Sequence, residues 1–275
     1  MDLDAYLRRI GWSGAIAPDL ASLQSLAARH TAAIAFENLN PFLGLPVSLD
    51  IGAVQSKIVG EGRGGYCFEQ NRLFAEVLRC VGFEVSELAA RVLWNQPEDA
   101  ITSRSHMLLR VELADASWLV DVGFGGQTPT GALKLIADIE QATPHEPYRL
   151  VSGDGEWRAQ TRLGDTWKTL YRFDLQPQYA IDYEAPNYFL STHPSSHFTR
   201  NLVAARAESG RRFALFNNEL AVHSVDGVTE RRRLRSAEEI VEVLKRDFLL
   251  TLPATPRLHE RLAEVAALSS PSGRG

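Results

Sequence analysis

The chain has 275 residues, 45% of them hydrophobic, and a formal net charge of −5. This length and apolar content suit a globular protein with a large core, built as one large domain or about two to three small ones. Mixed charges argue against a basic surface for nucleic acid or anionic membranes, and no apolar run approaches the ~18 residues that span a bilayer. The acidic N-terminus lacks the apolar segment of a signal peptide, so we expect a cytoplasmic protein.

The first 82 residues show helical patterns. Helices are predicted over residues 2–10, 19–30 and 51–59, with a short irregular or helical piece at 35–39 that ends before Pro41. A glycine-rich run at 60–65 breaks regular structure, and a further helix then begins near Cys67 and ends at Gly82. The positive end of a helix dipole favours a thiolate over a thiol. Cys67 is therefore a candidate nucleophile, and the alternative is an inert buried cysteine.

The two cysteines, Cys67 and Cys80, lie on the same predicted helix. A rise of 1.5 Å per residue separates them by roughly 20 Å, which is too far for a disulfide. We therefore expect free thiols in a reducing compartment. The sequence also lacks a CxxC pair or another ligand cluster, so neither a zinc site nor any other metal site is predicted.

After Gly82 the pattern changes from helical to alternating, which predicts a small barrel or sandwich. Strands are expected at residues 83–88, 90–93, 105–113, 118–122, 148–151, 157–160 and 167–173. Residues 182–194 are expected to form a connector. Beyond it we expect short strands at 199–205, 212–216, 219–223 and 227–232, then helices at 236–248, which a Ser236–Glu239 capping box opens, and 258–268. The Ser/Gly/Pro-rich end, 269–275, is expected to be frayed.

A cysteine nucleophile needs a histidine base and a third group that orients the histidine. Among seven histidines, His106 lies within a predicted strand, and its side chain faces away from Met107 and Leu109. Asp121 lies in the next strand among apolar residues, where a buried carboxylate requires a partner. A tight turn centred on Asp115 would place Asp121 opposite Leu109, about three residues from His106. Contact between the two side chains would then require a bulge or a different register.

Each of these residues also has a purely structural interpretation. His106 could be a hydrogen-bonded core histidine, Asp121 a turn residue, and the segment 123–126 a flexible connection. The functional interpretation therefore depends on their joint presence.

The motifs around these residues resemble those of the arylamine N-acetyltransferases, and the resemblance spans nearly the whole chain. It is carried by FEN at 36–38, RGGYCFEQN at 63–71, RSHMLL at 104–109, VDVGFG at 120–125, YFLST at 188–192 and SSHF at 195–198. The resemblance implies an α+β fold with a cysteine-protease-like Cys-His-Asp core. Its implied parts are an N-terminal helical bundle (residues 1–82), a central antiparallel β-barrel (83–186), and a connector with a C-terminal α/β lid (187–275).

The resemblance implies a catalytic triad of Cys67, His106 and Asp121. In the implied ping-pong reaction, the Cys67 thiolate attacks acetyl-CoA, and the acetyl-cysteine then acetylates an arylamine or arylhydrazine. Acetyl-CoA is thus a substrate, and no bound cofactor is expected. The implied partners are small molecules, as in xenobiotic metabolism, rather than nucleic acid or membrane.

Residues beside the implied triad are candidates for binding the amine and the acyl-CoA. Glycines in the segment 123–126 would let the backbone approach the acyl donor, and aromatic side chains would form a wall for a flat amine. The candidates are Phe36, Val92, Ser105, Gly123, Phe124, Gly125, Gly126 and Phe198.

Glu37 and Arg63 lie in the family-like motifs but have no role in acyl transfer. We expect them to pair and to fix the loop before Cys67. Breaking such a partly buried pair could cost several kcal/mol. The run of arginines at 231–235 is typical of a solvated surface, and a phosphate site for CoA is its alternative interpretation.

Two other functions fit the same residues. An amide synthase, or another acyl-transferring or hydrolysing enzyme, could use the same triad, and acceptance of acetyl-CoA would distinguish it. A non-catalytic protein that binds CoA or arylamines is the second alternative, although a binding protein has no need for all three residues.

Overall fold

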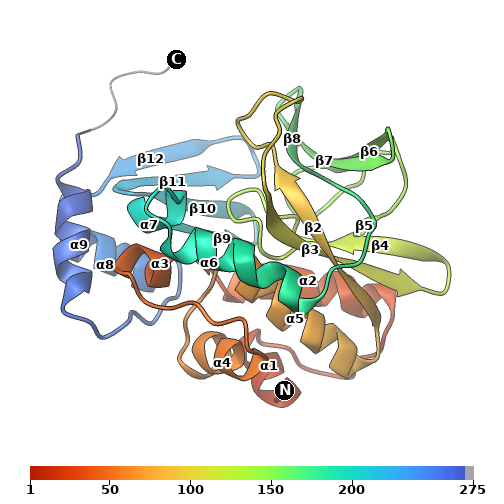
Figure 1. Cartoon of the computed structure of the whole chain (residues 1–275), viewed down its shortest axis with the longest axis horizontal. Coiled ribbons are helices and arrows are strands. Elements are labelled where there is room, and N and C mark those ends of the chain that lie inside the picture. The colour runs from red at the N-terminus through yellow and green to blue at the C-terminus, as the bar shows by residue number, and fades with distance from the viewer. Residues whose placement is uncertain (270–275) are drawn as a thin grey trace.

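Two antiparallel sheets and a group of N-terminal helices make up the computed structural model, which describes residues 1–269 (Figure 1). Helices come first along the chain, a nearly closed barrel follows, and a second sheet with two helices completes it, so the expected α+β class is confirmed. Between residues 1 and 269, no helix combines the length and apolarity needed to cross a membrane. The predicted frayed end lies outside the described residues apart from Ser269.

The N-terminal helices occupy the predicted segments. Asp2, Asp19 and Asp50 each accept a hydrogen bond from the backbone N–H three residues later, as N-cap residues do. The last helix ends at Gly82, whose φ of 105° lies in the left-handed region that favours glycine. The helices are α1 (Leu3–Arg9), α2 (Leu20–Ala33), α3 (Leu39–Leu43), α4 (Ile51–Gln55) with the π-helical turn η1 (Ser56–Gly60), and α5 (Cys67–Val81).

The segment around Pro41 differs from the prediction. Helix α3 continues through Pro41 instead of ending before it. A proline in the first turn removes only an N–H group that has no intrahelical partner, so the helix tolerates it. Just before this helix, Phe36 and Glu37 form the short strand β1, which pairs with a strand of the C-terminal sheet.

The barrel sheet has the strand order β5-β4-β3-β2-β8-β7-β6. Bridges from the segment after β5 to β6, Ala137 to Leu150 and Gln141 to Tyr148, nearly close it. The segments predicted as two strands at 83–88 and 90–93 form one strand. The strands are β2 (Glu84–Val92), β3 (Arg104–Leu113), β4 (Ala116–Val120), β5 (Leu133–Lys134), β6 (Tyr148–Gly153), β7 (Glu156–Leu163) and β8 (Thr166–Phe173).

Strand β3 separates two hydrophobic cores. Met107, Leu109 and Val111 belong to the core that packs against α5, as the alternating pattern predicts. Leu108 points the other way, into the barrel interior. His106 lies on the same side of the strand as Leu108, because side chains alternate along a strand. The strand thus carries a polar side chain into the barrel while its apolar face covers the helices.

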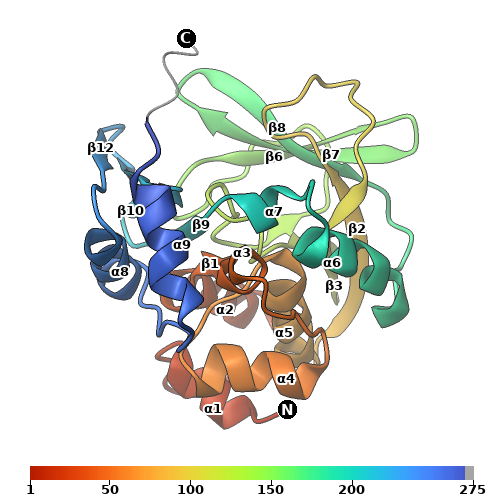
Figure 2. The ribbon, with the colours of Figure 1, turned by 60° about the vertical axis from the view of Figure 1, so that its left-hand side comes forward.

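The lid consists of the second sheet, in the order β1-β9-β10-β11-β12, with two helices on one face. Figure 2 shows these helices on the outer side of the lid, away from the barrel strands. Apolar side chains of both layers form a separate core. The elements are β9 (Val203–Glu208), β10 (Arg211–Phe216), β11 (Glu219–Ser224), β12 (Thr229–Arg233), α8 (Ala237–Arg246), whose N-cap is the predicted Ser236, and α9 (Arg257–Ala266).

The connector prediction for residues 182–194 is wrong, because this segment is helical. Pro186 lies in the first turn of its helix, where a proline does not interrupt the hydrogen-bond pattern. The strand expected from residue 199 begins instead at Val203, after a short helix. The helices are η2 (Ala180–Tyr183), α6 (Glu184–Thr192) and α7 (His197–Arg200). One predicted domain boundary, 186/187, falls within α6, and the division into three domains stays a prediction.

Candidate active site

Cys67 is the first residue of α5, as the sequence predicts, and its side chain is buried. Its Sγ lies 3.6 Å from the carbonyl oxygen of Ser105 at the start of β3. One residue earlier, the backbone N–H of Tyr66 donates to the Glu69 carboxylate, which anchors the first turn of the helix. The second thiol, Cys80, is exposed, and both cysteines are free.

His106 and Asp121 form a direct contact, with 2.7 Å between His106 Nε2 and Asp121 Oδ2. Leu109 pairs with Val120, so Asp121 lies opposite Leu108 and diagonally across from His106 on the same face. The two-residue turn at 114–115 shifts the register by one residue from the predicted pairing. The diagonal contact therefore needs no bulge in the described β3–β4 ladder.

Asn71 holds Asp121 in place, a role that sequence reasoning missed. Its Nδ2 donates to Asp121 Oδ1 at 3.0 Å and to the Met107 carbonyl at 2.7 Å, while its Oδ1 accepts from the Val122 N–H. The Gly123 N–H donates to the same carboxylate oxygen at 2.9 Å. Asn71 lies four residues after Cys67, so a search of that helix face for polar residues could have found it.

The surroundings of His106 favour its charged form. Burial by itself lowers the pKa of His106, but the charge and hydrogen bond of Asp121, with a smaller contribution from Cys67, raise it to about 10. Burial raises the pKa of Asp121, whereas the His106 charge and the hydrogen bonds that the carboxylate accepts bring it below its usual value. Since Asp121 occupies Nε2, the other ring nitrogen, Nδ1, is available to Cys67.

Two aromatic rings fix the His106 imidazole. The Tyr171 ring lies 5.1 Å from it at an angle of 38°, and the Phe124 ring lies 5.3 Å away, edge to face at 88°. The imidazole is thus packed between the two rings, tilted against Tyr171 and edge to face with Phe124. The packing thus restricts the imidazole to one orientation, between Asp121 and Cys67.

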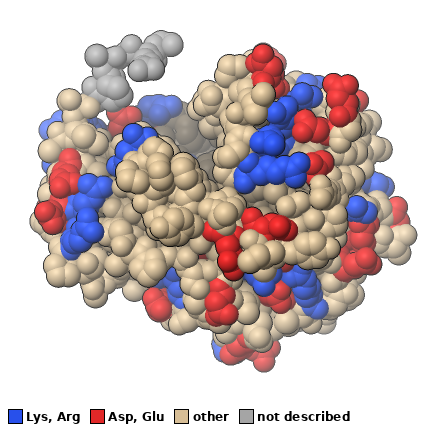
Figure 3. Space-filling model, in the orientation of Figure 1, with Lys and Arg blue, Asp and Glu red and all other residues tan. Residues whose placement is uncertain are grey.

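Cys67 and His106 line a cavity of about 860 Å³ between the barrel and the lid. Figure 3 shows the hollow on this face of the molecule. The cavity includes every predicted substrate residue: Phe36, Val92, Ser105, Gly123, Phe124, Gly125, Gly126 and Phe198. Sequence reasoning missed the lining that comes from the segments after β2 and β4, from α6 and α7, and from the lid sheet. These residues are Trp94, Asn95, Gln96, Thr102, Gln127, Leu190, His197, Val203, Ala214, Phe216 and His223.

Comparison with known proteins identifies the family. A family model described as N-acetyltransferase matches residues 19–257. An arylamine N-acetyltransferase of Mycolicibacterium smegmatis is 41% identical over 271 residues, which cover 96% of this chain and 98% of the relative. This chain belongs to the arylamine N-acetyltransferase family. It is therefore an acyltransferase, and the family that its motifs resemble is confirmed.

Solved structures of arylamine N-acetyltransferases share this fold. One from Mycobacterium smegmatis has a TM-score of 0.94 at 40% identity and covers 98% of this chain and 100% of its own. One from Mycobacterium marinum in complex with CoA has a TM-score of 0.92 at 39% identity, covering 96% of this chain and 99% of its own. The arrangement of helices, barrel and lid is thus that of the family.

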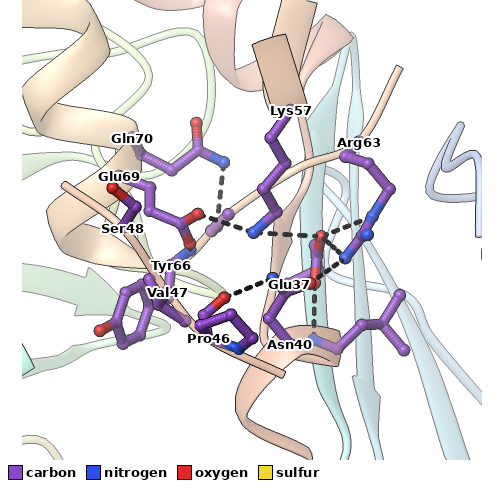
Figure 4. A network of polar contacts seen from close by, with 12 residues as sticks. Glu37, Asn40, Pro46, Val47, Ser48, Lys57, Arg63, Tyr66, Glu69 and Gln70 are labelled. Atoms are coloured by element: carbon purple, nitrogen blue, oxygen red, sulfur yellow. Dashed lines mark hydrogen bonds and ion pairs between the residues drawn. The ribbon is translucent and has the colours of Figure 1, made fainter. Parts of the chain in front are cut away.

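In this arylamine N-acetyltransferase, Glu37 and Arg63 form the predicted pair, with Arg63 Nη2 2.8 Å from Glu37 Oε1 (Figure 4). Arg63 also donates to Asn40, and the second Glu37 oxygen accepts from the backbone N–H of Leu39. Sequence reasoning missed Lys57, whose Nζ lies 2.7 Å from Glu69 and 3.8 Å from Glu37. Because Glu69 also binds the backbone before Cys67, the network fixes the loop that leads into α5.

The two buried carboxylates of this network, Glu37 and Glu69, have pKa values that are shifted in opposite directions. Burial raises the pKa of Glu37, but the Lys57 and Arg63 charges outweigh it, so the pKa falls below its usual value. At Glu69 burial prevails over the attraction of Lys57, and the pKa is raised. Of these two carboxylates, Glu37 is thus the more firmly ionised.

Arginines 231–233 lie on the exposed edge strand of the lid. Among residues 1–269, no three His, Cys, Asp or Glu side chains are arranged to hold a metal ion.

Proposed function

We propose that this protein transfers an acetyl group from acetyl-CoA to arylamines or arylhydrazines through an acetyl-cysteine on Cys67. The main support is the contact of a buried, oriented His106 with Cys67 and Asp121 at the cavity wall. Further support comes from relatives. A Salmonella typhimurium relative is named as both an arylamine N-acetyltransferase and an N-hydroxyarylamine O-acetyltransferase, and the Mycobacterium marinum structure holds CoA.

The first half-reaction transfers the acetyl group to the protein. His106 accepts the thiol proton at Nδ1, and the Cys67 thiolate attacks the thioester carbonyl carbon. The bond from that carbon to the CoA sulfur breaks, and the imidazolium returns its proton to the departing thiolate. Asp121 stabilises the imidazolium throughout. Since one thioester replaces another, the step is nearly isoenergetic.

The second half-reaction uses the same groups in the opposite direction. The amine nitrogen attacks the acetyl-cysteine carbonyl, neutral His106 takes the amine proton, and Cys67 leaves as a thiolate. CoA must depart before the amine reaches the acetyl group, because both approach Cys67 through one cavity. This order is a ping-pong mechanism. The aromatic residues Phe36, Phe124 and Phe198 provide the wall on which a flat amine packs.

Mass spectrometry after incubation with acetyl-CoA tests the covalent step. We expect one added acetyl group on the wild type and none on Cys67→Ala. Cys80→Ala removes the exposed thiol of the same helix and should still gain the group, which then transfers to an added arylhydrazine. Absence of the adduct at neutral and alkaline pH would exclude the mechanism. An adduct that is released only to water would indicate a hydrolase.

A further inference from the structure

A buried chain of hydrogen bonds runs from helix α1 to the backbone beside the reaction centre, and the proposed acetyl transfer does not involve it. The Tyr6 hydroxyl lies 2.9 Å from His30 Nδ1, and His30 Nε2 lies 2.6 Å from Gln70 Oε1. All three side chains are fully buried. Burying polar groups costs free energy unless each finds a partner, and apolar side chains would fill the same space without that requirement.

The hydrogen bonds of this chain have a defined direction. Gln70 Nε2, whose side chain is drawn in Figure 4, lies 2.8 Å from the carbonyl oxygen of Ala35 and 3.2 Å from that of Gly65. Carbonyl oxygens only accept, so the amide nitrogen must face them and Oε1 must face His30. His30 must then donate from Nε2 and accept the Tyr6 proton at Nδ1. Burial lowers the pKa of His30 to about 4, so the ring is neutral at pH 7, as this pattern requires.

Both carbonyl groups adjoin residues of the active-site cavity. Ala35 precedes Phe36, which lines the cavity, and Gly65 lies two residues before Cys67. The two segments are in tight contact, since a Cβ on Gly64 would overlap the Ala35 carbonyl oxygen. One amide group thus fastens the Phe36 segment to the loop that leads into α5.

Cys67 and Phe36 differ in what else holds them. The start of α5 has its own anchor, because the Tyr66 N–H donates to the Glu69 carboxylate. Phe36 is paired on its other side with strand β9 of the lid, so it lies between the lid and the loop. Loss of the Gln70 hydrogen bonds should therefore shift Phe36 relative to Cys67.

We propose that His30 is a positioning residue for the aromatic acceptor: through the Gln70 amide, it fixes the Phe36 ring relative to Cys67. The inference rests on the proposed acetyl transfer and adds a determinant of acceptor preference to it. Without a donor at position 30, Gln70 Oε1 is buried and unpaired, so the amide turns away from the carbonyl groups that it holds. A displaced Phe36 ring fits a flat acceptor poorly, whereas an acceptor without a ring does not use that wall.

Acetyl transfer to phenylhydrazine and to unsubstituted hydrazine measures this preference. In His30→Leu, the ratio of kcat/KM for the two acceptors should fall roughly tenfold, mainly through KM for phenylhydrazine, at the lower end of what apolar fit contributes to specificity. A merely structural role would lower both values alike and leave the ratio unchanged, which would overturn the inference. His30→Gln restores a donor near the position of Nε2 and should recover most of the ratio.

Thr31→Val is the matched control on the same helix. Thr31 is also buried, but its hydroxyl donates to the carbonyl oxygens of Ala27 and Ala28 in its own helix. The variant removes a buried polar group of similar cost and should keep the wild-type ratio. A fall in this variant equal to that in His30→Leu would overturn the positioning role.

The double variant His30→Leu/Gln70→Met keeps the test decisive if His30→Leu does not fold. It replaces both partners with apolar side chains of similar size, so neither is left buried and unpaired opposite the other. Its ratio should equal that of His30→Leu, because the two residues act through the same amide. A wild-type ratio in the double variant would overturn the inference. So would nitrogen chemical shifts of the wild type that show a proton on His30 Nδ1 at pH 7.

The wild type separates this inference from the proposed function. If it acetylates both hydrazines and the variants keep its ratio, acetyl transfer stands and His30 has no positioning role. If the wild type transfers the acetyl group to neither hydrazine, the proposed function itself fails, and the inference falls with it.

Discussion

His106 is buried between a carboxylate, a thiol and two aromatic rings, and this position determines its charge. Its pKa of about 10 lies above the ordinary value of about 6.5. A raised pKa means that the charged form stabilises the folded state fully below pH ~6.5, and that this contribution is lost as the pH rises through about 10. Across the neutral range the imidazolium is therefore the main form of His106, as the proposed pairing with a Cys67 thiolate requires.

This charge state predicts how Cys67 reacts with iodoacetamide. In the wild type, alkylation should already be fast at pH 6 to 7, because the imidazolium stabilises the thiolate. In His106→Gln, the rate should rise only towards the ionisation of an ordinary thiol, near pH 8.5. The exposed Cys80, followed by peptide mapping in the same samples, provides the internal control. Identical pH profiles for Cys67 in both proteins would contradict the assignment of His106.

Glu37 and Arg63 give a prediction about stability. Arg63→Ala leaves a fully buried carboxylate without its closest cation, so it should lower the free energy of unfolding by about 3–5 kcal/mol at pH 7. The lowered pKa of Glu37 stabilises the fold above the ordinary carboxyl range, and this contribution disappears as the pH falls through the folded-state value. The difference in the free energy of unfolding between Arg63→Ala and the wild type should therefore be smaller at acidic pH.

Urea unfolding of the wild type, Arg63→Ala and the double variant Arg63→Met/Glu37→Leu measures this effect. The double variant removes both charges together and should recover much of the loss. Full stability of Arg63→Ala at pH 7 would show that the pair does not hold the loop before Cys67.

Helix α5 and the segment after β4 meet so closely that one glycine is required between them. A Cβ on Gly123 would lie 2.9 Å from Cys67 Cα, 3.0 Å from the Cys67 carbonyl oxygen and 2.8 Å from Asn71 Nδ2. A Cβ on Gly126 would meet nothing within 4 Å. The two glycines belong to the same short segment and line the same cavity, but only one of them is constrained by α5.

Gly123→Ala should therefore push the segment away from α5 and disturb the bond from Asn71 to Asp121. We expect a fall in acetyl transfer to hydrazine of at least tenfold, together with a loss of stability, since overpacking typically costs about 1–3 kcal/mol. Gly126→Ala should fold as the wild type does, which thermal unfolding will check. Equal behaviour of the two variants would show that the close approach to Cys67 is unimportant.

Patterns of local sequence predict the elements well and their junctions poorly. The start of α5 at Cys67 and the alternation of β3 follow from residue periodicity, and both are confirmed. The register between β3 and β4 depends on whether the turn contains two residues or three, which periodicity does not specify. Pro41 and Pro186 misled the prediction, because each lies in a first helical turn, where proline is tolerated.

Local sequence patterns do not predict contacts between distant parts of the chain. Strand β1 joins the lid sheet through pairing of Phe36 with Ala205, and Asn38 donates to the carbonyl oxygens of Phe198 and Asn201. Arg212 of the lid lies 2.7 Å from Glu146 and donates to the carbonyl of Gly126 beside the cavity. Sequence analysis found the cavity residues that lie in motifs, but it could not bring the lid residues to them.

The thiol, the imidazole and the carboxylate come from different places along the chain, and this has a consequence for biosynthesis. A ribosome completes α5 before it has made β3 and β4, so a growing chain first carries Cys67 without its base. The contact of His106 with Cys67 that we propose for catalysis can form only once the β3–β4 hairpin has closed against the helix. An unfinished or misregistered chain therefore lacks the base, and the reactivity that we propose for Cys67 arises only in molecules that have already folded correctly.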